Sequence, residues 1–218
     1  MTDLPETNLT MLTLVKPEGQ LEVSLERRPM PTPKPHEVLV KVLAAPINPS
    51  DLGLLFGGAD MTTARASTKD GQPSITADVP PAGMRAMAGR IGDALAIGNE
   101  GCGTVVAAGN SPEAQALLGK TVALLGGEMY AEYRCLPVQM VMPLPDGTEP
   151  ADGASCFVNP LTSLAFTETM RMESHSAIVH TAAASNLGQM LVKICAKDGI
   201  PLVNIVRSDA QVEILKGI

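Results

Sequence analysis

A strand–helix–strand pattern near the end of the 218-residue sequence constrains the fold most. Residues 177–180 form a short apolar run, 186–197 place apolar residues at helical spacing, and 201–206 form a second apolar run. Two strands joined by a helix of this length predict a βαβ unit, which requires a parallel sheet. Another helical pattern begins at residue 209, so this part of the chain predicts the start of an α/β domain.

The preceding sequence predicts a different architecture, because short apolar or alternating runs are separated there by glycine and proline. Short strands at this spacing are typical of an antiparallel barrel or sandwich. Four prolines within 29–35 favour an extended surface segment between two of the strands. The predicted strands cover 11–15, 21–26, 37–45, 101–109, 121–125, 129–136 and 139–142.

Two segments do not follow this strand pattern. Residues 60–92 are rich in Thr, Ala, Ser, Gly and Pro, and we expect an insertion loop there that can include a helical turn. The loop is either a mobile surface segment or a functional lid. Residues 151–172 are helical in pattern but are interrupted near Asn159-Pro160. Asn159 is expected to cap a second helix whose first turn contains Pro160.

The composition excludes several classes of protein. The formal charge is −7, aromatic residues are 2% and tryptophan is absent, which argues against nucleic-acid binding. Apolar runs fall short of the ~18 residues needed to span a bilayer, and the polar N-terminus does not resemble a signal peptide. The four scattered cysteines form no C-x-x-C pair. We therefore expect a cytoplasmic protein with reduced thiols and no membrane or nucleic-acid partner.

The turn between the first strand and the helix is a candidate phosphate-binding site. A G-x-G-x-x-G fingerprint would place its glycines at Ala183, Ser185 and Gly188, and only the last is glycine. Small residues at the other two positions still let the backbone approach a pyrophosphate. The helix that starts near Asn186 and Leu187 offers free N–H groups and the positive end of its dipole. Alternatively, Ser185 or Asn186 only caps this helix.

The end of the second strand predicts which dinucleotide such a turn would bind. A site that prefers NAD places Asp or Glu there, whereas this sequence has Arg207 followed by Ser208. An arginine can pair bidentately with a 2′-phosphate. These residues therefore favour NADP(H), although a solvated arginine at a strand end remains the alternative.

Several motifs in order give the chain a resemblance to the medium-chain dehydrogenase/reductase superfamily, and especially to its zinc-independent NADPH:quinone oxidoreductase-like branch. The motifs are the proline-rich lead into PHEVLVKV at 35–42, INPSD at 47–51, GNEGCGTV at 98–105, NPLT at 159–162 and the small-residue turn at 182–188. The resemblance implies a β-rich GroES-like barrel domain over 1–158. It also implies a linking helix and the first βαβ of an NADP-binding α/β Rossmann domain over 159–218, truncated and therefore incomplete, with the active site in the cleft between the domains.

The same resemblance implies a function and a set of site residues. The expected activity is NADPH-dependent hydride transfer to a small-molecule quinone or α,β-unsaturated carbonyl, in a protein expected to be a homodimer. Asn48 and Asp51 are the candidate catalytic residues, with Asn48 and Thr162 near the nicotinamide. Asp51 can instead hold its loop, and Thr162 can instead bond a helix carbonyl. Where zinc enzymes of the superfamily carry metal ligands, this chain has the amides Asn48, Asn99 and Asn159. Amides bind zinc poorly, so no metal is expected.

Two other functions stay open. Enoyl thioester reductases of mitochondrial type share several of these motifs, but they place a catalytic tyrosine after the N-P-x-D motif, where this chain has Leu55-Phe56. Tyr130 and Tyr133 are the only tyrosines, and both are expected to pack in a strand. A non-catalytic binding or assembly protein is the third alternative, because the glycine fingerprint is weakened and the chain ends early in its second domain.

Overall fold

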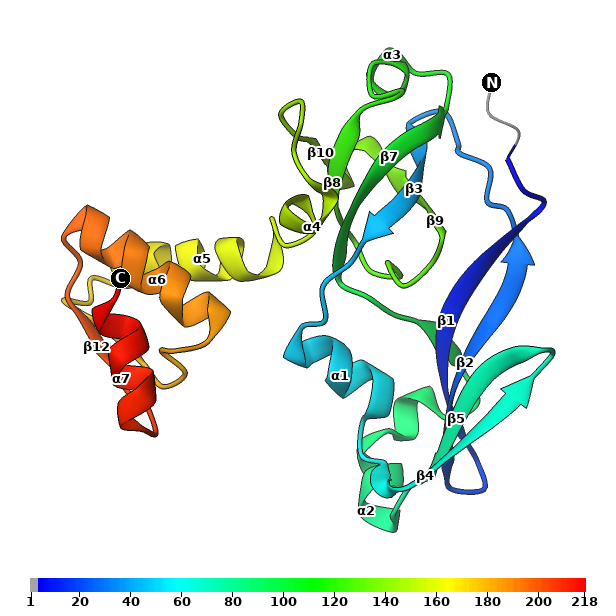
Figure 1. Cartoon of the computed structure of the whole chain (residues 1–218), viewed down its shortest axis with the longest axis horizontal. Helices are drawn as coiled ribbons and strands as arrows, with labels where there is room; N and C mark the ends of the chain where they lie inside the picture. Colours follow the sequence, from blue (N-terminus) through cyan, green and yellow to red (C-terminus); the bar gives the residue numbers. More distant parts are fainter. Residues whose placement is uncertain (1–3) are drawn as a thin grey trace. The chain divides into compact units, whose positions relative to one another are not determined.

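A computed structural model describes residues 4–218, which divide into two compact units (Figure 1). The first unit extends to Ala154, and the second comprises Ser155–Ile218. The sequence-based boundary was set between residues 158 and 159, so the division in the structure falls slightly earlier.

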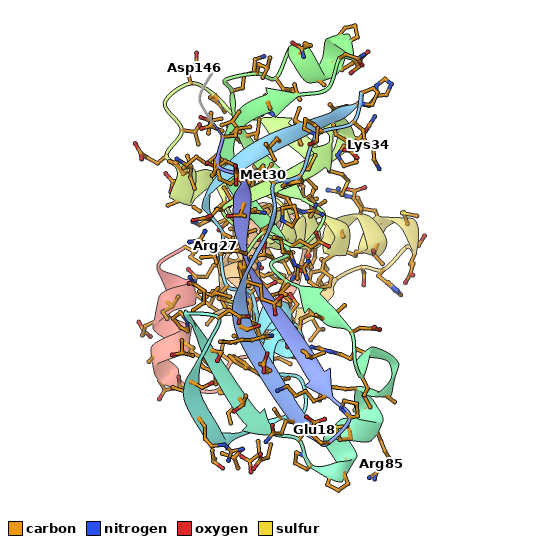
Figure 2. All side chains as sticks on the ribbon, turned by 90° about the vertical axis from the view of Figure 1, so that its right-hand side faces the viewer. Glu18, Arg27, Met30, Lys34, Arg85 and Asp146 are labelled. Atoms are coloured by element: carbon orange, nitrogen blue, oxygen red, sulfur yellow. The ribbon has the colours of Figure 1, made fainter. Side chains whose placement is uncertain are left out.

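The first unit contains two five-stranded sheets built from sequence-distant strands. The first sheet has the order β4-β5-β2-β1-β6, and all its pairs are antiparallel. Its centre is the long β1–β2 hairpin, with Glu18 at the turn (Figure 2). The bounds are β1 (Thr7–Lys16), β2 (Gln20–Pro29), β4 (Asp60–Lys69), β5 (Gln72–Asp78) and β6 (Ala94–Ala96).

The second sheet has the order β10-β8-β7-β3-β9 and is also antiparallel. It is joined to the first sheet by backbone hydrogen bonds: the Met11 N–H donates to the Tyr130 carbonyl (2.8 Å) and the Glu132 N–H to the Leu9 carbonyl (3.0 Å). The predicted β-rich architecture is therefore confirmed. The bounds are β3 (Glu37–Ala44), β7 (Glu100–Ala108), β8 (Thr121–Leu125), β9 (Tyr133–Pro137) and β10 (Val141–Pro143).

Each sheet has its own hydrophobic core. In the second sheet, Val40 and Val122 belong to a cluster of fully buried aliphatic side chains. In the first sheet, Val15 and Leu21 pack with Leu55, which comes from a helix. Burying a side chain of this size stabilises a fold by roughly 1.5–3 kcal/mol. Leu55 therefore fixes its helix against the β1–β2 hairpin.

The α-helices of the first unit are short, and each begins with a proline in its first turn, where the missing N–H is not needed. Two strand predictions nearby need correction. Residues 129–132 precede β9 rather than form it, and 138–140 form a 3-10 turn before β10. The bounds are α1 (Pro49–Phe56), α2 (Pro81–Ala86), η1 (Ala88–Arg90), α3 (Pro112–Gln115), η2 (Val138–Met140) and α4 (Pro150–Gly153).

The prediction of an insertion loop over 60–92 is wrong. The segment forms the β4–β5 hairpin, followed by α2, η1 and the start of the return to β6. Its turn is Asp70-Gly71, and both residues have positive φ (50° and 77°), which is the conformation that two-residue hairpins favour. β4 is an edge strand that is exposed along most of its length, so it carries little of the apolar alternation by which strands are predicted.

The second unit matches the predicted βαβ pattern. β11 and β12 pair in parallel, with His180 opposite Asn204. The preceding helix begins at Val158 after Phe157, so Asn159 lies inside its first turn and does not cap it as predicted. The bounds are α5 (Val158–Met172), β11 (Ile178–His180), α6 (Asn186–Asp198), β12 (Leu202–Asn204) and α7 (Asp209–Lys216). None of the helices over 4–218 is both long and apolar enough to cross a membrane.

Candidate active site

The turn that connects β11 to α6 forms without the first two glycines of the fingerprint. Ser185 has ordinary extended dihedrals (φ −67°, ψ 166°) and caps α6, because its Oγ accepts the Gly188 N–H at 3.1 Å. Among the described residues, those with positive φ lie outside 181–186. Since no left-handed conformation is required here, Ala183 and Ser185 occupy the glycine positions without strain.

The retained glycine is the one that the packing requires. A Cβ on Gly188 would lie 2.2 Å from the Ala183 carbonyl oxygen and 2.7 Å from that of Ala182. These are backbone atoms that cannot rotate away. Gly188 therefore lets the start of α6 pack directly on the turn, which is the role of the last glycine of the fingerprint.

The first turn of α6 leaves two backbone donors. Ser185 already binds the Gly188 N–H, and Gln189 donates its backbone N–H to the Ser185 carbonyl at 2.9 Å. The N–H groups of Asn186 and Leu187 precede these and have no carbonyl one turn earlier in the helix to bind. They point out of a helix N-terminus, where an anion is favoured by both hydrogen bonding and the dipole.

A cavity of about 250 Å³ lies beside this turn, within the second unit. It brings together the turn and Arg207, which the sequence analysis had assigned to one cofactor. The Arg207 backbone N–H donates to the Gln211 Oε1 at 2.9 Å, which fixes the main chain, while the residue itself is exposed. The lining residues are Thr181, Ala182, Ala183, Ala184, Ser185, Ile205, Val206, Arg207 and Gln211.

Other predicted cofactor residues have different surroundings. Ser208 does not line the cavity, and its Oγ caps α7 by accepting the Gln211 N–H at 3.4 Å. The Thr162 hydroxyl donates to the Val158 carbonyl at 2.6 Å, which is the helix-internal bond given as its alternative. Asn48 belongs to the first unit, at the start of α1.

Asn48 is buried (4% exposed), and its side chain is held by a carboxylate that the sequence analysis missed. The Asn48 Nδ2 donates to the Glu100 Oε1 at 3.0 Å. Glu100 is fully buried at the start of β7. An ionisable residue at the head of an otherwise apolar strand was the available signal, because a buried acid needs a partner.

Asp51 ties together two segments that are distant in sequence. It is fully buried, its Oδ2 accepts the Asn48 N–H at 2.8 Å and its Oδ1 accepts the Asn99 N–H at 3.0 Å. A second link runs parallel, since the Asn99 Nδ2 donates to the Ser50 Oγ at 2.9 Å. These contacts are those of a carboxylate that positions Asn48, the role given to Asp51 as an alternative to catalysis.

Tyr130 also supports this region from outside β9. Its hydroxyl donates to the Pro46 carbonyl at 2.9 Å. Burial, together with the nearby Asp51 carboxylate, raises the pKa of Tyr130 well above its usual value. The phenol is therefore a neutral donor throughout the physiological range, and it holds the segment that leads into Asn48.

The histidine that ends β11 has one buried ring nitrogen. The His180 Nδ1 has no hydrogen-bond partner among the described residues. Its ring lies 5.8 Å from that of Phe166, and burial lowers its pKa. Over 4–218, no three His, Cys, Asp or Glu side chains are grouped so as to hold a metal.

Comparison with known proteins places this geometry in a family. The model of the alcohol dehydrogenase GroES-like domain matches residues 34–146. The chain belongs to this family. The match covers the second sheet, α1 with Asn48 and Asp51, and β7 with Glu100. It confirms that the β-rich first unit is a GroES-like domain.

Several of the proteins that this GroES-like chain resembles are named as reductases. A crystal structure assigned as an NADPH:quinone reductase from Mesorhizobium loti is 29% identical, with a TM-score of 0.69, over 99% of this chain and 59% of that one. Prostaglandin reductase-3 of Mus musculus is 26% identical over 95% of this chain and 48% of its own length. The mitochondrial enoyl-[acyl-carrier-protein] reductase of Caenorhabditis elegans is 25% identical over 83% and 44%.

These matches confirm the resemblance to the medium-chain dehydrogenase/reductase superfamily and its quinone oxidoreductase-like branch. They also confirm the fold class, in which a GroES-like domain is followed by an α/β segment. The chain spans about half the length of the curated relatives it matches.

Proposed function

We propose that the protein containing this GroES-like chain is a zinc-independent, NADPH-dependent oxidoreductase that reduces quinones or α,β-unsaturated carbonyls. The observation that carries the proposal is the cavity that joins the α6 turn to Arg207. One side of it is the turn that leads into the N-terminus of α6, where backbone N–H groups would bind a pyrophosphate. The other side carries Arg207, whose guanidinium would bind a 2′-phosphate. NAD(H) has no 2′-phosphate, so this pairing favours NADP(H).

The second unit would hold the cofactor through its own backbone. Asn186 and Leu187 supply N–H groups at the start of α6, Ser185 orders that start, and Gly188 permits the close packing. Ala183 is fully buried under the turn. Arg207 would pair with the 2′-phosphate, since a guanidinium binds phosphate bidentately. The hydroxyls of Thr162 and Ser208 already make hydrogen bonds within their helices. We therefore propose that these two residues contribute less to cofactor binding than Arg207 and the α6 turn.

The first unit would supply the substrate-side residues. Bound NADPH provides the hydride, and negative charge then develops on the substrate oxygen, where fixed hydrogen-bond donors lower the barrier. We propose the Asn48 amide as one such donor, with its orientation set by Glu100. Asp51 is a positioning residue, because its two oxygens hold the backbone on which Asn48 sits. An amide in this role fits a site without zinc, since amides are poor zinc ligands.

The test compares the binding of NADPH with that of NADH, and nicotinamide fluorescence measures both. Replacing one charged hydrogen-bonding partner costs about 1.5–3 kcal/mol, or about a tenfold to hundredfold loss of affinity. Arg207→Ala is therefore expected to weaken the affinity for NADPH by at least tenfold and to leave the affinity for NADH unchanged. Lys216→Ala is the control, because Lys216 is an exposed cation of the same unit that pairs with Glu213 away from the cavity. An NADH preference that Arg207→Ala does not alter would contradict the proposal.

Enoyl thioester reduction is the second candidate, favoured by two mitochondrial enoyl-[acyl-carrier-protein] reductases among the relatives. Against it, α1 carries Leu55 and Phe56 where that activity needs a tyrosine, and Tyr130 is bonded to Pro46. Assaying NADPH oxidation with a 2-enoyl thioester and with a quinone separates the two. A protein that binds neither NADPH nor NADH would instead support a non-catalytic role.

We further propose that the protein is a cytoplasmic homodimer. The four cysteines are free within residues 4–218, as is usual in a reducing compartment, which supports the location. Cell fractionation tests the location. Light scattering of the purified protein tests the assembly, and a monomer mass at micromolar concentration would refute it.

A further inference from the structure

A large apolar hollow in the first unit is not used by the cofactor site. Its volume is about 620 Å³, within the roughly 300–1,000 Å³ of small-molecule sites. A smaller hollow of about 150 Å³ shares Met11, Val23, Leu25 and Ile75 with it, so the two adjoin and form one groove. The large hollow is lined by Leu9, Met11, Val23, Leu25, Val42, Ala45, Ile47, Leu55, Phe56, Ile75, Tyr130, Ala131 and Glu132.

The groove offers no charge to a ligand. Glu132 is the sole charged residue of its lining, and its carboxylate already accepts the Leu9 N–H at 3.1 Å. Side chains alternate along β2, so the ion pairs of Glu22 with Lys16 and Lys69 lie on the face opposite Val23. An acidic or basic ligand would find no partner here, whereas a neutral hydrocarbon chain would lose only its contact with water.

One end of the groove adjoins the element that carries Asn48. Ile47 lines the hollow, is 69% exposed, and directly precedes Asn48. Leu55 and Phe56 line it from the last turn of α1, whose first turn holds Asp51. A molecule whose reactive end lay near Asn48 could therefore extend an unbranched tail along β1, β2 and β5.

We infer that this groove binds the linear, uncharged hydrocarbon tail of the substrate. The substrate class is then a quinone or enone that carries a straight alkyl chain, rather than a small polar carbonyl. The identity of the reactive end rests on the proposed function. The tail site stands on the geometry of the first unit alone, and its binding needs no cofactor.

The experiment measures displacement of the neutral fluorophore Nile red from the purified chain by 1-butanol and by 1-octanol. Each methylene taken from water strengthens binding by about fourfold until the groove is filled. 1-Octanol is therefore expected to displace Nile red at a concentration at least tenfold lower than 1-butanol does. Ile75→Glu, which places a carboxylate in both hollows, should weaken the binding of 1-octanol by at least tenfold.

Leu95→Glu is the matched control, because Leu95 lies on β6 outside both hollows and is similarly exposed (37%, against 40% for Ile75). Equal 1-octanol binding by the two variants would overturn the inference, provided that circular dichroism shows both folded. A chain that dimerises through this face would also overturn it; Ile75→Glu would then restore the monomer and 1-octanol would not bind. NADPH titration of the same samples separates a failure of the tail site from a failure of the proposed function.

With active protein, the same variants test the tail during turnover. Ile75→Glu should raise the KM for trans-3-dodecen-2-one by at least tenfold and leave the kcat and the KM for 3-penten-2-one unchanged. Leu95→Glu should change none of these values. A KM that rises equally for both ketones would refute a tail-specific site.

Discussion

Replacing Asp51 by asparagine tests how the start of α1 is held. The Asp51 carboxylate is fully buried, and each of its oxygens accepts a different backbone N–H, one from Asn48 and one from Asn99. An asparagine has the same shape but only one accepting oxygen. Its NH₂ group would face the second backbone N–H, so one hydrogen bond is lost and two donors oppose each other.

The magnitude follows from these two contacts. A hydrogen bond to a charged group contributes about 1.5–3 kcal/mol, and a buried donor left unsatisfied costs about 1–3 kcal/mol. Because one contact persists in weakened form, we expect Asp51→Asn to lower the free energy of unfolding by about 3 kcal/mol. A domain is typically stable by only about 5–15 kcal/mol, so this loss is large.

The sequence offers a selective readout. The chain has no tryptophan, and both of its tyrosines, Tyr130 and Tyr133, lie in the first unit. Tyrosine fluorescence during urea unfolding therefore reports on the unit that contains Asp51. Asp93→Asn is the control, since Asp93 is exposed and lies in the same unit. A loss below about 1 kcal/mol, or one equal to that of the control, would refute the positioning role.

Three further predictions follow from local geometry. Gly188→Ala should destabilise the second unit by about 1–3 kcal/mol, because the added Cβ meets backbone atoms. Gly53→Ala should instead stabilise α1 by about 0.5–1 kcal/mol, because nothing lies near its added Cβ. Calorimetry measures both changes. Gly71→Ala should cost about 1 kcal/mol at φ 77° and loosen the β4–β5 hairpin in hydrogen exchange. Burial, reinforced by Glu37, raises the pKa of Cys135 to about 11, so iodoacetamide labelling should reach half its maximum near pH 11, and Glu37→Gln should lower that midpoint. Because this pKa is raised, the stability that the thiol contributes is complete below its usual value of 9.0 and is lost as the pH rises through about 11.

The helical part of the fold was the most predictable from sequence. α6 was expected over 186–197 and ends one residue later, and α7 was expected where it lies. Both helices carry an apolar face at regular spacing and a serine cap, which are local signals. The start of α5 was misplaced because Asn159-Pro160 imitates a cap followed by a first-turn proline, while the helix begins at Val158.

The β4–β5 hairpin was missed for a physical reason. An exposed edge strand has no buried face, so its residues need not alternate, and Thr, Ala and Ser are compatible with either strand or loop. The Asp70-Gly71 pair was the remaining local signal, and it is a strong one when two runs of suitable length flank it. Segments of low hydrophobicity are therefore better judged by their turn residues than by their periodicity.

The support around Asn48 could be predicted only in part. Asp51 lies three residues away and could be proposed as a holding residue from local sequence. The Glu100 contact joins residues 52 positions apart, and the Tyr130 contact with Pro46 joins residues 84 apart, through strand pairing that the sequence pattern does not specify. Long-range side-chain contacts depend on sheet order, which is the part of the fold that periodicity leaves open.

The incomplete glycine fingerprint need not count against cofactor binding. The three glycines of the motif serve separate purposes, namely a tight turn, close approach of the backbone to a pyrophosphate and close packing of the helix. In this chain the turn forms with ordinary dihedrals, so the first purpose is met by Ala183. Ser185 adds a methylene and a hydroxyl at the second position, but the hydroxyl is turned back onto the Gly188 N–H and stabilises the helix start. The third purpose is the one that no side chain can serve, and there the glycine is kept, with backbone oxygens 2.2 Å and 2.7 Å from where a Cβ would lie. The substitutions thus fall where the geometry tolerates them, which favours a functional cofactor turn over a degenerate one.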